Sequence, residues 1–200
     1  MPPAPYAAMR RRAALLLTAL ALAGCAVLAP ALYTPPPLPA YRMDLSRPGA
    51  QVDAAAAARL ISAYRATEGL GPVRIDPTLS AIARRQAAVQ AAAGHIGHDL
   101  GLGTLDRRAE AAGYDYAAIA ENVAANYPTL GAVFMAWQKS DEHRRNMLMP
   151  AVTEIGIAVV QAPGTRFKTY WALELGSRRR HPAPAKATTV RWGAPFPFAH

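Results

Sequence analysis

Only one cysteine, Cys25, occurs among the 200 residues, and this excludes any disulfide within the chain. Two segments, 33–41 and 181–198, hold a large share of the 18 prolines and cannot be helical. Proline lacks the amide hydrogen and blocks the preceding turn, so both segments are expected to be extended. The apolar run Ala13–Ala23 is too short for a membrane span of about 20 residues. The chain length suits one domain with flanking segments.

Acidic residues are scarce, with 13 Asp and Glu against 22 Lys and Arg, and the net charge is +9. The excess does not lie in the middle of the chain, because residues 52–176 contain 12 basic and 12 acidic side chains. A nucleic-acid-binding domain carries its basic surface on the fold itself. We therefore predict no nucleic-acid partner, and we interpret the basic flanks as a targeting segment and a solvated tail.

The N-terminus has the pattern of a secretory signal. Arg10–Arg12 precede the short apolar run, which ends in Leu22-Ala23-Gly24-Cys25. A basic segment followed by a short apolar one is typical of exported proteins, and the final tetrapeptide resembles a bacterial lipobox, whose cysteine is lipidated. We predict a protein anchored in the bacterial cell envelope through lipid on Cys25, in the periplasm or at the outer membrane. The alternatives are an uncleaved anchor and a chance cysteine.

Composition divides the chain into four parts. Residues 1–24 are the predicted signal peptide and residues 25–51 a proline-rich tether that lifts the domain from the membrane. Residues 52–176 are the predicted folded domain. Residues 177–200 are basic and rich in proline, and we expect this tail to be disordered.

Helical and strand patterns both occur in the folded segment. Asp53 and Asp76-Pro77 are typical helix starts, and after Glu154 the apolar spacing changes from a helical to a strand-like period. Pro163-Gly164 favours a type II turn between two antiparallel strands. Residues 120–125 fit neither pattern clearly. The expected helices are 53–68, 76–94, 105–112, 129–139 and 142–148, and the expected strands are 154–161 and 166–176.

An ordered series of short motifs extends over about 125 residues of the segment 52–176. Each motif is weak alone, but their order and spacing together are specific. They are Leu60–Arg65, Gly69-Leu70 and Ile75–Leu79, then Ile96-Gly97-His98, Ala120–Val123, Trp137–Leu148, Thr153–Ala158 and Tyr170-Trp171.

The series resembles the CAP superfamily of cysteine-rich secretory, antigen 5 and pathogenesis-related-1 proteins, in its bacterial form. The resemblance implies an α+β fold, a three-layer α-β-α sandwich with a small antiparallel sheet. Ala120 and Glu142 each replace a usual glycine, and Ser140 stands where many eukaryotic members have a second acid. A full set of two histidines and two glutamates therefore cannot be carried over.

The resemblance also implies that His98, Glu121 and His143 converge in one surface cleft, with Asn122 beside them. Such a set could hold zinc or another divalent metal through His98 and His143 and activate water for hydrolysis. Glu121 and Glu154 are the candidate acids for that chemistry.

Plainer roles remain open for each residue of this set. His98 could bond the backbone of its loop, and Glu121 with Asn122 could tie loops together. His143 could lie on a solvated helix face, and Glu154 could pair with Arg144 or Arg145.

Three functions follow. The first is a binding module, without enzymatic activity, for a lipid-like, peptide or cell-envelope ligand; relatives are often associated with lipid or sterol binding. The second is a metal-assisted hydrolase that uses His98, His143 and Glu121. The third is a structural envelope protein with a vestigial cleft. We favour the first, because an incomplete ligand set weakens the second.

Overall fold

A four-stranded sheet lies at the centre of residues 38–180, the part of the chain that the computed structural model describes. Its strand order is β1 (Arg74–Ile75), β3 (Glu154–Ala162), β4 (Lys168–Arg178) and β2 (Tyr116–Ala125). β3 and β4 form the predicted antiparallel hairpin, β2 pairs antiparallel with β4, and the short β1 is parallel to β3. β2 is therefore an edge strand.

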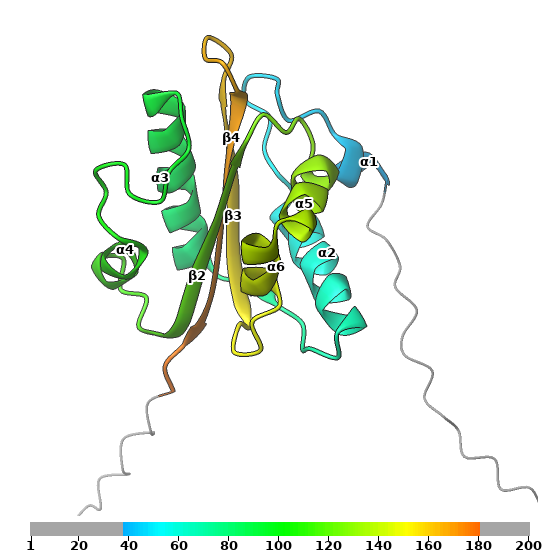
Figure 1. The fold of residues 1–200 in the computed structure, drawn as a ribbon, viewed down its shortest axis with the longest axis vertical. Helices are drawn as coiled ribbons and strands as arrows, with labels where there is room; N and C mark the ends of the chain where they lie inside the picture. Colours follow the sequence, from blue (N-terminus) through cyan, green and yellow to red (C-terminus); the bar gives the residue numbers. More distant parts are fainter. Residues whose placement is uncertain (1–37, 181–200) are drawn as a thin grey trace, which may run out of the picture. The chain divides into compact units, whose positions relative to one another are not determined.

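Helices cover both faces of the sheet, which confirms the three-layer α-β-α prediction (Figure 1). On one face, the large core cluster joins sheet residues to α2 (Ala54–Thr67), α5 (Leu130–Lys139) and the end of α6 (Asp141–Met147). α1 (Leu38–Arg42) lies against α5. The other face carries α3 (Pro77–Ala93) and α4 (Leu105–Ala111).

Local signals set the helix ends close to the predicted residues. The Asp53 carboxylate accepts the Ala56 N–H at the start of α2. Asp76 accepts two N–H groups at the start of α3, where Pro77 occupies the first turn. Such caps satisfy main-chain donors that have no partner within the helix. α3 ends at Gly94, whose φ of 72° is readily adopted only without a Cβ.

The two faces of the hairpin carry different cores. Ile155 and Leu173 belong to the large cluster under α2 and α5, whereas Ala158 and Ala172 pack against α3. Because strand side chains alternate between faces, the small residues all meet the same helix and let it approach closely. At Gly156 a Cβ would lie 2.1 Å from the α3 main chain, so no side chain fits.

Two local predictions need correction or completion. Residues 120–125, left unassigned, belong to β2. The Pro163-Gly164 turn exists, with the Thr165 N–H donating to the Ala162 carbonyl at 2.9 Å. It is not type II, because Gly164 does not have the positive φ that this turn requires at its third residue. The left-handed residue of this connection is Lys168, with a φ of 63°.

The domain begins earlier than predicted, which corrects the tether of residues 25–51. Leu45 is 1% exposed, and its N–H donates to the Pro128 carbonyl. The Gln161 amide also donates to the carbonyls of Leu45 and Ala50. Residues 38–51 are thus part of the folded unit. At the other end, β4 continues two residues past the predicted boundary, to Arg178.

The predicted signal peptide, Cys25 and residues 181–200 of the tail lie outside the described residues. Within residues 38–180, no helix has both the length and the apolar character that crossing a membrane requires.

Candidate functional site

The edge strand β2 positions the candidate site. Neighbouring strand residues point to opposite faces of a sheet, and here the neighbours are Glu121 and Asn122. Glu121 contacts the layer of α3 and α4, whereas Asn122 contacts α6. One strand therefore supplies both layers with a polar side chain, and both side chains are buried.

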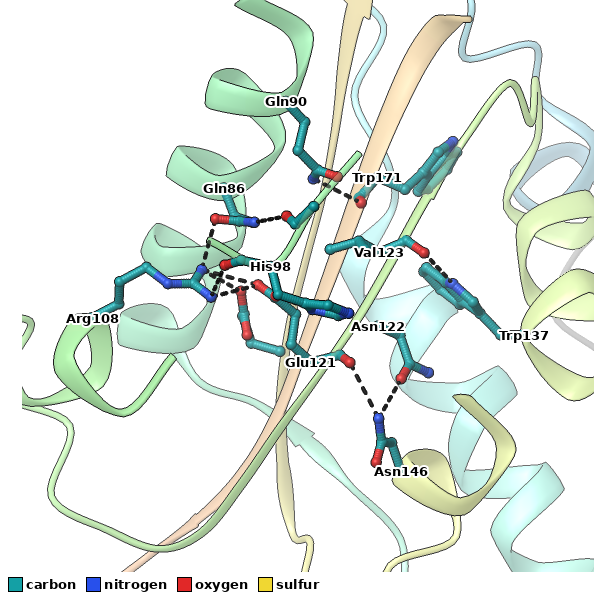
Figure 2. A network of polar contacts seen from close by, with 12 residues as sticks. Gln86, Gln90, His98, Arg108, Glu121, Asn122, Val123, Trp137, Asn146 and Trp171 are labelled. Atoms are coloured by element: carbon teal, nitrogen blue, oxygen red, sulfur yellow. Dashed lines mark hydrogen bonds and ion pairs between the residues drawn. The ribbon is translucent and has the colours of Figure 1, made fainter. Parts of the chain in front are cut away.

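The Glu121 carboxylate is fully engaged by two partners. One oxygen lies 2.7 Å from His98 Nδ1, and the other accepts both terminal nitrogens of Arg108 at 2.9 Å (Figure 2). The Glu121 and Arg108 side chains are 2% and 6% exposed, whereas the His98 ring is 60% exposed. Arg108 also donates to the Gln86 side chain, whose own amide holds the Gly97 carbonyl. This network fixes the loop that carries His98.

The hydrogen bond to Glu121 sets the chemistry of His98. It raises the pKa of the imidazole above its usual value, against partial burial and the nearby charge of Arg108, which lower it. An ionised carboxylate only accepts hydrogen bonds, so we assign the Nδ1 proton to His98. Its other ring nitrogen then remains for a ligand, as an acceptor when neutral and as a donor when protonated.

Glu174 is a buried acid behind Glu121 that sequence reasoning missed. It pairs with Glu121 in the β2–β4 register and is 0% exposed. Neither oxygen meets a donor among the described residues, and Arg108 lies 3.6 Å away. Burial and the negative Glu121 raise the pKa of Glu174 well above that of a free glutamate. A protonated Glu174 accounts for both the missing donor and the raised pKa, because its O–H can then donate to Glu121.

On the opposite face of β2, amide side chains tie the strand to α6. Asn122 donates to the main-chain carbonyl of His143 at 3.0 Å, and Asn146 donates to the Asn122 oxygen and to the Glu121 carbonyl. This is the tying role that the sequence left open for Asn122. Asn146 takes part in the same role.

His143 is half-buried on α6, not on a fully solvated face. Burial lowers the pKa of His143, and the charge of His98 lowers it further. No hydrogen bond joins the two imidazoles. The charge of Glu142, one of the departures from the family pattern, acts to raise the pKa of both histidines. In His143 the effect of burial is larger, and the pKa stays below its usual value. The structure bonds Glu121 to His98 directly, whereas His143 is tied to β2 through its main-chain carbonyl, which accepts from Asn122.

The side chains do not fit a metal ion as they lie. In residues 38–180, no three His, Cys, Asp or Glu side chains form a group that could hold one. Both oxygens of Glu121 are already bonded, and His98 has turned its Nδ1 to that carboxylate. Zinc sites need open ligand atoms converging on one point. Metal binding by His98 and His143 stays a prediction that this arrangement does not favour.

Glu154 belongs to a different cluster, which corrects its prediction as an acid of the same site. Its side chain pairs with Arg74 and accepts the Tyr114 O–H at 2.6 Å, and Arg178 lies 3.9 Å away. Its ion-pair partners are therefore not Arg144 or Arg145. Glu154 begins β3, beside β1, so it binds the residues of that end of the sheet.

Two side chains of neighbouring segments have other roles. His95 is exposed and contacts only the Ala93 carbonyl, so it is outside the site. Trp137 is 1% exposed in the large core.

The missed residues had faint signals. Arg108 is one of two adjacent arginines, and only the rotation of α4 decides which one is buried. Glu174 interrupts an apolar strand on the face that α3 covers.

Residues 58–175 match the family model described as the cysteine-rich secretory protein family, CAP. The uncharacterized protein YkwD of Bacillus subtilis is 33% identical over 104 residues, which are 52% of this chain and 40% of that protein. The chain thus spans less than half the length of this curated relative.

Solved structures show the same fold at low sequence identity. An outer surface protein of Borrelia burgdorferi matches 66% of this chain and 99% of its own, with a TM-score of 0.57 and 21% identity. An extracellular protein of Bacillus anthracis that contains an SCP domain matches 62% of this chain and 39% of its own. Its TM-score is 0.54, also at 21% identity. At these identities the likeness concerns the fold alone.

Proposed function

The chain belongs to the cysteine-rich secretory protein (CAP) family, and on this premise we propose that it is an exported binding module. Its ligand is a component of the bacterial cell envelope, held by hydrogen bonds from the exposed ring of His98. Such a component is a lipid-like molecule, a peptide or a wall polymer. Two of the similar structures are those of an extracellular and an outer surface protein, which supports export.

One observation carries the choice of binding over hydrolysis: both oxygens of Glu121 are occupied by His98 and Arg108. A general base must reach the proton that it removes, and this carboxylate is only 2% exposed behind His98 and Arg108. A nucleophile is not paired with the site either, since no Ser or Thr hydroxyl of residues 38–180 hydrogen-bonds His98. What remains for chemistry is one ring nitrogen, which suits recognition.

Membrane attachment is the second part of the proposal. Lipid on Cys25 would hold the domain at a bilayer, since multiple acyl chains anchor a protein stably. Metabolic labelling with an alkyne-bearing fatty acid tests this in a bacterial host. We expect label on the wild type and none on Cys25→Ser. Label on both proteins would place the lipid elsewhere, and label on neither would remove the anchor.

His98→Gln tests the binding site, with His95→Gln as the matched control, because both histidines lie in one loop and only His98 contacts Glu121. The Cys25→Ser chain serves as background, so that lipid attachment does not contribute. The three proteins are sedimented with isolated wall polymer and with lipid vesicles. We expect His98→Gln to weaken binding at least tenfold and His95→Gln to leave it unchanged. Equal binding by all three would favour the structural role instead.

A zinc titration of the same proteins distinguishes the binding module from a metal-assisted hydrolase. Binding of one zinc ion that is lost in His98→Gln, together with zinc-dependent release of product from envelope material, would contradict the proposal. Zinc uptake that is equal in both histidine variants supports it.

A further inference from the structure

A pocket lies between α3 and α4, on the face of the sheet that also carries Arg108. Its volume is about 220 Å³. The wall is formed by small or aliphatic side chains together with three arginines, and no lining residue is acidic. The lining residues are Ala81, Ile82, Arg85, Leu102, Arg107, Arg108, Ala111 and Ala112.

The three arginines differ in burial. Arg85 on α3 and Arg107 on α4 are exposed, so each can turn toward a group that enters between the helices. Asp106, next to Arg107, offsets part of that positive charge. Arg108 is buried in the wall, with a side chain 6% exposed. The pocket therefore combines an apolar interior with a positively charged rim.

Arg108 has one donor left over. Its terminal nitrogens bond Glu121 and Gln86, but its Nε is buried and has no partner among the described residues. Buried donors are nearly always satisfied, so this one leaves the Arg108 guanidinium incompletely compensated in the wall of the pocket. An anion also suits the two exposed arginines, because charge-assisted hydrogen bonds are the strong ones. An apolar wall adds preference for a ligand with a hydrocarbon part.

We infer that this pocket binds an amphipathic anion, one carboxylate or phosphate group carried on a short apolar chain. The acidic group lies between Arg85 and Arg107, and the hydrocarbon part contacts Ile82 and Leu102. The volume equals that of roughly seven water molecules, so the pocket holds part of an acyl chain and not a whole membrane lipid. The site is separate from the one proposed at His98, and either can fail without the other.

Octanoate, octyl phosphate, octanol and inorganic phosphate test the two halves of this ligand separately. Each is titrated by calorimetry into the full chain carrying Cys25→Ser. We expect octanoate and octyl phosphate to bind, and octanol and inorganic phosphate to bind at least tenfold more weakly. Equal binding of octanol would overturn the role of the arginines. Equal binding of inorganic phosphate would overturn the role of the apolar wall.

The double variant Arg85→Gln with Arg107→Gln locates the site. We expect it to weaken octanoate binding at least tenfold with an unchanged melting temperature, since both side chains are exposed. Arg84→Gln is the matched control, because Arg84 is also exposed on α3 but lines a different pocket. The same affinity in the wild type and the double variant would refute the proposal. Binding only to anionic vesicles, without octanoate binding, would also refute it and would indicate a membrane surface.

Discussion

Replacing Glu174 by Gln should stabilise the protein, increasingly so as the pH rises. Burial and the neighbouring Glu121 raise the pKa of Glu174 well above the 4.5 of a free glutamate. Between 4.5 and the raised value, the unfolded chain releases a proton that the native state keeps. Native-state stability is therefore full below pH 4.5 and declines as the pH rises through this interval.

The size of the effect follows from linkage. One proton held by the native state alone changes the free energy of unfolding by about 1.4 kcal/mol per pH unit. Glutamine has the shape of the neutral acid, carries no proton to lose, and can donate its N–H to Glu121 as the O–H does. The variant should thus match the wild type near pH 4.5 and gain on it by up to about 1.4 kcal/mol for each further unit.

Urea unfolding followed by the fluorescence of the buried Trp137 and Trp171 measures this, at half-unit steps from pH 4.5 to 7.5. Glu68→Gln, at an exposed position of the helix end, controls for the change in net charge. A constant difference between Glu174→Gln and the wild type across this range would refute the assignment of a proton to Glu174. Glu174→Leu is also uncharged but has no group that can donate to Glu121. Its free energy of unfolding should therefore lie below that of Glu174→Gln.

Three further outcomes are expected. Glu121→Gln should lower the pKa of His98, because the hydrogen bond to Glu121 is the largest cause of its rise; nuclear magnetic resonance titration of the ring measures this, and an unmoved midpoint would contradict the pairing. Arg65→Met should lower the free energy of unfolding by at least about 3 kcal/mol, since the buried guanidinium binds four main-chain carbonyls that would lose their donor. Arg59→Met, exposed on the same helix, should change it little. Gly156→Ala should cost at least about 2 kcal/mol in thermal unfolding, because its Cβ would overlap the α3 main chain; a melting temperature within a degree of the wild type would show that α3 can shift.

The helices were predictable because their signals are local. Asp76-Pro77 and Gly94 mark the ends of α3 in the sequence itself, and the structure uses them as caps. β2 was not predictable in this way, because alanine is depleted in strands and residues 120–125 include three alanines. That strand forms because β4 pairs with it and helices cover both its faces, which are contacts between distant parts of the chain.

The site was predictable only in its outline. Family motifs brought His98, Glu121 and His143 together, and the structure pairs the first two directly. No local pattern distinguishes Arg108 from Arg107, and the burial of Glu174 depends on how closely α3 approaches the sheet. Those two residues surround the Glu121 carboxylate, so the contacts of the site required the tertiary structure.

Because residues 38–51 pack against the domain, they shorten the distance that can separate the domain from a bilayer. With lipid on Cys25, as proposed, only the 12 residues 26–37 separate the anchor from α1. Fully stretched, they reach about 45 Å. This is roughly half the length of the predicted tether, which ended at residue 51. The start of α1 must therefore stay within that distance of the membrane, and inserting glycine and serine residues before it would let the domain move farther away.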